Sequence, residues 1–304
     1  MSWTSSNYKY SVTVKNNDLL RASFNELTRQ TFGFDFVDWY ESGHWGEMYI
    51  PHSVVDGEKV VSNVSVNLMQ FDMGGVKKNY IQLGTVMTDT EYREQGWNRR
   101  IMERILKEYE GKADGIYLFG NDSVLNYYPR FGFRPSKEYE YYMPWNYGEN
   151  IVPYVIEKVD MSQEEQSERL YDVIRNYSGD PAVRNQNDAM CMSNNLGLYQ
   201  FWMAAGFGES IYYLPETGTY ASADAEEGVL RLHQIFGKAR VDIARLAKAF
   251  GEAVKEVVLE YTPVHKEEFL VREHREDDCT LFLLGEDLER IEKEKLRFPV
   301  LSHA

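Results

Sequence analysis

A polar, basic stretch at the junction of an expected strand and an expected helix holds the residues best suited to chemistry. Residues 88–106 read TDTEYREQGWNRRIMERIL, and Gly96 lies there among three arginines, Arg93, Arg99 and Arg100. The first turn of a helix leaves about four backbone N–H groups unpaired and carries roughly half a positive charge. A phosphate suits such a turn, and a glycine lets it approach without meeting a Cβ atom. The sequence therefore predicts an anion site at this corner.

The same residues also allow a plain loop that leads into a solvated, basic helix start. Taken alone, one glycine beside arginines favours the plain loop. The stretch has neither the G-x-x-x-x-G-K-[ST] pattern of a P-loop nor the further glycines of a dinucleotide-binding turn. In the anion-site interpretation Gln95 donates through its amide and Glu94 points outward.

The elements that must position this corner can be read from hydrophobic periodicity. Trp97, Ile101, Ile105 and Tyr109 recur at four-residue spacing, which is typical of one apolar helix face. Before the corner we expect helices at 16–31 and 35–43 and strands at 47–56, 58–72 and 79–87. After it we expect a strand at 115–120, a helix at 123–133 stopped by Pro129, and a strand at 139–145.

A second constellation, NDSVLNYYPRFGF at 121–133, follows one strand later. Together the two stretches resemble the GNAT superfamily of N-acetyltransferases, which carries [QR]-x-x-G-x-[GA] and then N-x-x-A-x-x-[FY]-Y-x-x-x-G-F. Residues 93–98 match the first motif, with Asn98 where the family prefers Gly or Ala. The second motif is matched in register by Asn121, Val124, Tyr127, Tyr128, Gly132 and Phe133. The resemblance covers residues 8–147 and is strongest from 80 to 135.

The resemblance implies that acetyl-CoA is the co-substrate. Its pyrophosphate would lie on the turn formed by Arg93, Glu94, Gln95, Gly96, Trp97 and Asn98, with Arg99 beside it. The pantetheine arm would follow the strand that ends at Val86, Met87 and Thr88, which in the family splays from the next strand. Asn121 would hold the arm from the other side. The side chain of Asn98 would crowd or contact the pyrophosphate.

The implied reaction is direct transfer of the acetyl group to an amine, with Tyr128 as general acid. A phenol has a pKa of about 10 and stays protonated at neutral pH, so it can protonate the leaving thiolate. The backbone N–H near Val86 or Met87 would stabilise the oxyanion. The competing interpretation makes Tyr128 a core aromatic. The general base is left open among a water chain and four carboxylates, Asp35, Glu47, Asp89 and Glu91.

The element order begins again after a boundary near 148–153. In this second half we expect strands at 154–160, 210–215, 219–225, 229–236, 256–263 and 279–285, and helices from Ser162, at 242–254 and at 265–275. We therefore predict an α/β (α+β) fold of two GNAT-like domains, each with a mixed, mostly antiparallel sheet flanked by helices. Residues 1–149 would be the catalytic domain. Residues 150–304 would be a degenerate copy, because the corner around Gly237 lacks the motif.

Composition limits the partners. The formal net charge of −15 argues against binding to nucleic acid or to an anionic membrane surface. It favours a small-molecule or peptide amine as acceptor, such as a polyamine or an aminoglycoside. Aromatic residues at 34–49 would either line the acceptor pocket or form a core between helix and sheet. The last residues, RFPVLSHA, would either reach into the first domain or fray. An oligomer is possible.

Two cysteines and six scattered histidines show no metal-ligand spacing, so we expect no metal. The sequence contains no apolar run of about 18 residues and no signal-peptide pattern, so we expect a cytoplasmic protein. Two alternatives to the enzyme remain open: a non-catalytic acyl-CoA binding or sensing protein, and an interaction scaffold.

Overall fold

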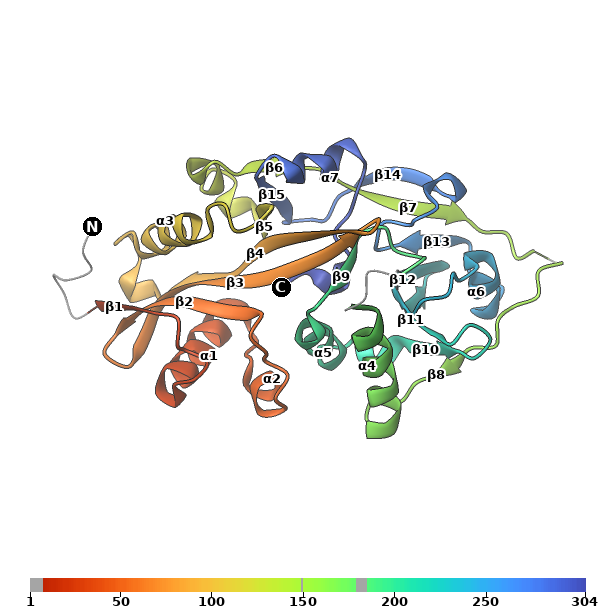
Figure 1. Ribbon diagram of the computed structural model, residues 1–304, viewed down its shortest axis with the longest axis horizontal. Coiled ribbons are helices and arrows are strands. Elements are labelled where there is room, and N and C mark those ends of the chain that lie inside the picture. The colour runs from red at the N-terminus through yellow and green to blue at the C-terminus, as the bar shows by residue number, and fades with distance from the viewer. Residues whose placement is uncertain (1–7, 149, 179–184) are drawn as a thin grey trace.

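The computed structural model describes residues 8–148, 150–178 and 185–304 as an elongated molecule with two β-sheets joined by a shared core (Figure 1). Helices cover both sheets, and the long β3–β4 hairpin crosses the middle of the molecule. The predicted fold class, a mixed α/β structure with two helix-flanked sheets, is confirmed. Residue 149, the predicted end of the first domain, lies outside the described residues.

The first sheet has the order β1–β2–β3–β4–β5–β15–β6, and β9 pairs with β3 beside this path. Neighbouring strands are antiparallel except for β4 and β5, which run parallel. The DG turn predicted at Asp56–Gly57 joins the second and third strands. The strands are β1 (Tyr8–Ser11), β2 (Tyr49–Asp56), β3 (Lys59–Met73), β4 (Val76–Thr88), β5 (Gly115–Gly120), β15 (Thr280–Leu284), β6 (Arg134–Ser136) and β9 (Cys191–Ser193).

Helices pack on both faces of this sheet. Helix α1 (Asp18–Phe32) begins where Asn17 Oδ1 accepts a hydrogen bond from the N–H of Leu20 at 3.1 Å, and it ends at Gly33. With α2 (Val37–Glu41) it covers one face, in a core that includes Phe24, Trp45 and Val60. Helix α3 (Trp97–Tyr109) covers the other face through the predicted apolar positions. The corner and the second motif are thereby held on the α3 side.

The second sheet repeats the pairing pattern of the first. Its order is β8–β10–β11–β12–β13–β7–β14, again with one parallel pair, β12 and β13, after three antiparallel pairs. The strands are β8 (Glu157–Lys158), β10 (Ile211–Leu214), β11 (Thr219–Glu226), β12 (Val229–Phe236), β13 (Glu256–Leu259), β7 (Glu138–Pro144) and β14 (Leu270–His274).

The two sheets exchange one strand each. Strand β7 precedes the predicted boundary but lies between β13 and β14, whereas β15 follows that boundary but lies between β5 and β6. A cut at residue 149 therefore does not separate the two sheets. The remaining helices are α4 (Glu164–Ser178), α5 (Leu196–Ala204), α6 (Ile243–Ala249) and α7 (Arg290–Lys293).

Two predicted helices are wrong. Residues 123–133 form two short 3₁₀ turns, Asp122–Val124 and Tyr128–Phe131, because Pro129 lacks the N–H that a helix needs and Gly132 has φ of 90°. Residues 265–275 form a brief turn followed by β14, whose residues pair with β7. Helix α5 was not predicted.

Candidate active site

Strands β4 and β5 separate at their carboxyl ends. Their parallel pairing runs from Tyr80 and Gly115 to Leu83 and Leu118, and then it stops. At the same level the register between β3 and β4 shifts, and Thr85 takes a left-handed φ of 48°. The separated strands leave a cavity of about 390 Å³, which we call the β4–β5 cavity.

The cavity connects the two faces of the first sheet. Its lining includes Leu83, Val86, Val124 and Tyr128, which belong to the core under α3. The lining also includes residues of the core under α1 and α2, namely Phe36, Trp39, Tyr49 and Phe201. The cavity is therefore lined by side chains from both faces of the sheet.

Tyr128 lies in the wall of this cavity. Its ring is 4% exposed and packs 5.3 Å from the ring of Phe282 and 6.1 Å from that of Phe133. A Cβ atom at Gly120 would lie 3.0 Å from the Tyr128 ring, so a larger residue there would push the ring aside. Burial raises the pKa of Tyr128, and no hydrogen bond of its hydroxyl is found among the described residues. The phenol therefore stays protonated and is available as a donor.

The corner at 93–98 is open. Gly96 begins α3 with φ of 75°, no side chain caps the helix, and a Cβ atom at Gly96 would have nothing within 4 Å. Glu94 also has a left-handed φ, of 63°, and Arg93 and Gln95 are exposed. Arg99 is exposed and forms an ion pair, with its Nε 2.8 Å from Glu103 Oε1. The N–H groups of this first turn are thus accessible to an anion.

The next two residues point inward. Trp97 is buried, with its ring 4.6 Å from that of Tyr8. The side-chain amide of Asn98 lies 2.5 Å from Ser62 Oγ. With its nitrogen facing the strands, the amide also reaches the carbonyl oxygen of Met87 at 3.1 Å and Thr88 Oγ1 at 3.2 Å. The side chain of Asn98 therefore links α3 to the ends of β3 and β4. Its contact with a pyrophosphate stays a prediction.

The other predicted coenzyme residues divide into two groups. Val86 and Asn121 line the cavity on opposite strands, together with Tyr128. Asn121 Oδ1 accepts hydrogen bonds from Ser123 N at 3.2 Å and from Ser123 Oγ at 2.6 Å. The side chain of Met87, in contrast, is buried under α1, and Thr88 bonds to Ser62, so only their backbones can serve a ligand in the cavity.

None of the four candidate carboxylates lines the cavity. Asp35 Oδ2 lies 2.9 Å from Arg29 Nε, and a hydrogen bond from the N–H of Val37 helps to lower its pKa. Glu47 pairs with Lys15 at 2.6 Å. Asp89 and Glu91 both pair with Lys59, at 2.8 and 3.4 Å. Among the described residues, no aspartate or glutamate side chain reaches the cavity.

Two further segments of the wall come from the second half. Helix α5 contributes Leu198, Phe201 and Trp202, and the chain end contributes Ala304. The carbonyl oxygen of Ala304 accepts a hydrogen bond from Gln82 Nε2 at 3.1 Å, and Trp202 Nε1 donates to the carbonyl oxygen of His303 at 2.8 Å. The chain end therefore reaches the first sheet. Asn195 before the apolar run LGLYQFWMA was the sequence signal for α5.

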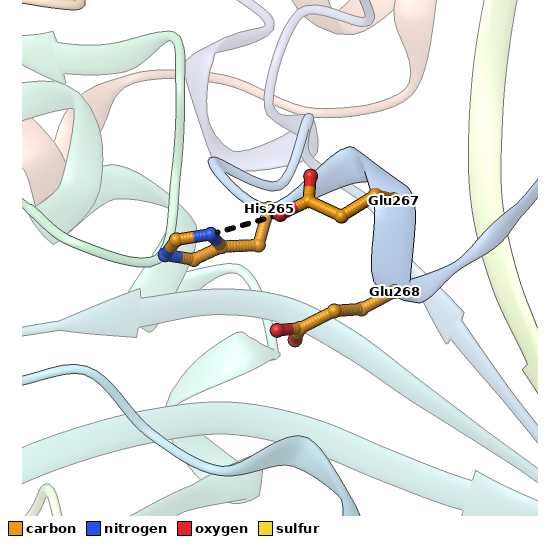
Figure 2. A group of neighbouring side chains, drawn as sticks. All are labelled: His265, Glu267 and Glu268. Carbon is orange, nitrogen blue, oxygen red and sulfur yellow. Dashed lines mark hydrogen bonds and ion pairs between the residues drawn. The ribbon is translucent and has the colours of Figure 1, made fainter.

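A group of possible metal ligands lies elsewhere, around the turn before β14. His265, Glu267 and Glu268 have ligand atoms within 4.8 Å of one another. Figure 2 shows the His265 ring turned toward Glu267, with Nδ1 3.3 Å from Oε1. Glu268 forms an ion pair with Arg240. Both carboxylates are exposed and none of the three residues lines the β4–β5 cavity, so we assign them no part in its chemistry.

Comparisons with known proteins agree with this geometry. Residues 9–136 match the family described as the acetyltransferase (GNAT) domain. A GCN5-related N-acetyltransferase from Kribbella flavida is 13% identical with a TM-score of 0.57, over 95% of this chain and 73% of that one.

Two other solved structures are similar. A protein of unknown function from Enterococcus faecalis, described as a probable N-acyltransferase, is 16% identical with a TM-score of 0.57, over 93% of this chain and 71% of that one. Eis1 from Mycobacterium abscessus is 11% identical with a TM-score of 0.55, over 90% and 72%. These likenesses show the fold. No curated protein sequence matches the chain, and no described helix has the length and apolar character to cross a bilayer.

Proposed function

We propose that this chain, whose residues 9–136 match the GNAT acetyltransferase domain, is an acetyl-CoA-dependent N-acetyltransferase. It moves an acetyl group directly to an amine. The observation that carries the proposal is the β4–β5 cavity, which opens where two parallel strands separate and has the buried hydroxyl-bearing ring of Tyr128 in its wall.

The described residues fit the co-substrate. The uncapped first turn of α3, with Gly96 open to approach, suits a pyrophosphate. Beyond Leu83 the β5-facing side of β4 has no strand partner, so the backbone from Gly84 to Thr88 is available to an extended, amide-containing arm. Asn121 lies across the gap. Acetyl-CoA supplies the activated thioester, and these residues bind and orient it.

Tyr128 is the general acid in this proposal. Because burial raises the pKa of its phenol, the side chain keeps its proton until a thiolate forms beside it. Positioned proton transfer of this kind contributes about 10²- to 10⁴-fold to a rate. A backbone N–H near Val86 or Met87 stabilises the oxyanion. Since no aspartate or glutamate side chain of the described residues lines the cavity, the amine loses its proton to water before or during the attack.

The second half is a degenerate copy in this proposal. At the corner equivalent to Gly96, a Cβ atom at Gly237 would lie 2.8 Å from Thr219 Cγ2, so the backbone is covered. The carboxylate of Asp242 already caps α6, accepting from Ala244 N at 2.9 Å and from Arg245 N at 3.2 Å. A helix start that holds its own carboxylate has no room for a phosphate.

The test combines acetyl-CoA binding by calorimetry with thiol release over a panel of amines. Tyr128→Phe should lower turnover by about 10²- to 10⁴-fold and leave acetyl-CoA binding nearly unchanged. Tyr127→Phe is the matched control, because its hydroxyl is also buried but does not line the cavity.

Each contrary result has a distinct meaning. An unchanged rate in Tyr128→Phe removes Tyr128 from the mechanism. Binding without turnover of any amine supports the non-catalytic acyl-CoA binding or sensing protein. No binding at millimolar acetyl-CoA supports the scaffold.

A further inference from the structure

One half of the β4–β5 cavity is walled by aromatic rings. The rings that come from α1, α2, β2, α5 and their loops are Phe32, Phe34, Phe36, Trp39, Tyr49, Phe201 and Trp202. Their centroids are close enough for each ring to touch the next: Phe34 to Phe36 is 5.3 Å, Phe36 to Phe201 is 5.7 Å and Phe201 to Trp202 is 5.5 Å. In Figure 1 the elements that carry them, α1, α2 and α5, lie on the side of the first sheet opposite α3. We call this surface the aromatic wall.

The wall offers few polar atoms to a ligand. The indole N–H of Trp39 donates to the carbonyl oxygen of Gly197 at 2.8 Å, and that of Trp202 donates to His303. The hydroxyl of Tyr49 is hydrogen-bonded to Thr85 Oγ1. Among the described residues, no carboxylate, ammonium, guanidinium or imidazole side chain lines the cavity. A ligand therefore meets ring faces and edges whose polar atoms are already satisfied.

Exposure changes along the wall. Phe32 and Phe34 are 45% and 43% exposed, whereas Phe36, Trp39 and Tyr49 are buried. The two exposed rings thus mark the mouth, and the three buried rings mark the floor beside the separated strands. Large exposed aromatic side chains at the mouth of a cavity are typical of a site for an apolar ligand.

The charge of the wall differs from that of the whole chain. The net charge of −15 attracts cationic amines to the surface, but among the described residues no aspartate or glutamate side chain lines the cavity to hold them. A polyamine or an aminoglycoside would lose the hydration of several ammonium groups there without gaining an acidic side chain to pair with each. A monoamine that has lost its proton enters the cavity uncharged and carries no second ammonium group. An aromatic group on this amine buries apolar surface against the rings of the wall.

We propose that the acetyl acceptor is a primary monoamine that carries an aromatic ring or a similarly bulky apolar group, bound against the aromatic wall. This inference rests on the proposed N-acetyltransferase function and names the substrate class of the same cavity.

The first experiment compares kcat/KM for 2-phenylethylamine, ethylamine, spermidine and kanamycin, with acetyl-CoA and the full chain. The phenyl group should raise kcat/KM about 10- to 100-fold over ethylamine, because its surface leaves water at the wall. 2-Phenylethylamine should also exceed spermidine and kanamycin. A faster reaction with either polycation, or equal rates for ethylamine and 2-phenylethylamine, would overturn the inference and leave the acetyltransferase function in place.

Two further outcomes are distinguishable. If hexanoyl-CoA outperforms acetyl-CoA while the amine side chain makes no difference, the wall binds the acyl group and the inference is overturned. If acetyl-CoA binds but none of the amines reacts, the proposed function fails and the inference fails with it.

A pair of variants tests the wall itself. Phe34→Asp places a carboxylate at the mouth, where the exposed side chain tolerates substitution. It should lower the preference for 2-phenylethylamine over spermidine by about tenfold or more, because a charge now pairs with the polyamine. Leu19→Asp adds the same charge at a residue that is 57% exposed and does not line the cavity, and it should leave the preference unchanged. An unchanged preference in Phe34→Asp would overturn the inference.

Discussion

Adding one methyl group at Gly84 tests whether the chain end forms part of the active cavity. Both Gly84 and Ala304 line it, and they are in close contact. A Cβ atom at Gly84 would lie 2.6 Å from the carbonyl oxygen of Ala304 and 3.0 Å from its carbonyl carbon. Both contacts are with backbone, so no flexible side chain can turn aside. Gly84→Ala must therefore move β4, the chain end or both.

The size of the effect follows from these distances. Ordinary van der Waals contact begins near 3.4 Å. The backbone of Ala304 must therefore retreat by about 0.8 Å, in a region where atoms are closely packed. Overpacking of this kind costs about 1–3 kcal/mol of unfolding free energy. A displacement near 1 Å at the reacting groups lowers catalysis by about 100-fold, so we expect kcat/KM to fall between about 10- and 100-fold.

The assay measures thiol release and urea unfolding for Gly84→Ala and for a control, Gly46→Ala. A Cβ atom at Gly46 would have nothing within 4 Å, so the control adds the same methyl group to open space. The control should retain wild-type activity and stability. If Gly84→Ala also keeps both, the chain end is not packed against β4 in solution and Ala304 is not part of the cavity wall.

Two further predictions concern stability. Asn98→Ala should lower the unfolding free energy by about 1–3 kcal/mol in urea titrations, because buried acceptors at the ends of β3 and β4 lose their partner. Its Kd for acetyl-CoA should stay at the wild-type value, and a large increase would show that the side chain contacts the ligand. Burial and the charge of Arg297 lower the pKa of His303 to about 3, whereas a histidine in the unfolded chain titrates near about 6.5. Below pH about 6.5 the histidine is protonated in the unfolded state but stays neutral in the folded state. The free energy of unfolding should therefore fall as the pH drops from about 6.5 toward 3. Denaturant titrations across this range should give a shallower fall for His303→Phe, and equal slopes would contradict the assignment.

Local patterns predicted the elements whose causes are local. The Asn17 cap, the Asp56–Gly57 turn and the four-residue spacing after Trp97 each act within one turn or one helix, and the structure contains the corresponding elements. The exchange of β7 and β15 could not be predicted in this way. Strand β15 pairs with β5 across more than half of the chain, and nothing in the sequence TLFLL selects that partner over its own neighbours.

The two sides of the cavity differ for the same reason. The corner at Gly96 and the stretch from Asn121 to Phe133 are contiguous motifs, and their resemblance to the GNAT motifs implied Val86, Asn121 and Tyr128, which line the cavity. Their roles in binding and catalysis stay predictions. The opposite wall joins Phe34 and Trp39 to Phe201, a residue from the other half of the chain. Such a wall forms only when the two halves of the chain pack together, and hydrophobic periodicity does not predict which distant segments pack against each other.

The exchange of strands also determines when this protein can mature during synthesis. The ribosome synthesises β5 and β6 first, and the strand that lies between them, residues 280–284, follows only after the whole second sheet. Until then a nascent chain carries an open seam in its first sheet, and Tyr128 lacks the neighbouring ring of Phe282. Strands with unpaired edges promote aggregation, so the nascent chain is exposed to aggregation, and open to chaperone binding, until residues 280–284 have been made. A chain that stops before residue 280 therefore lacks the Phe282 ring that packs against Tyr128.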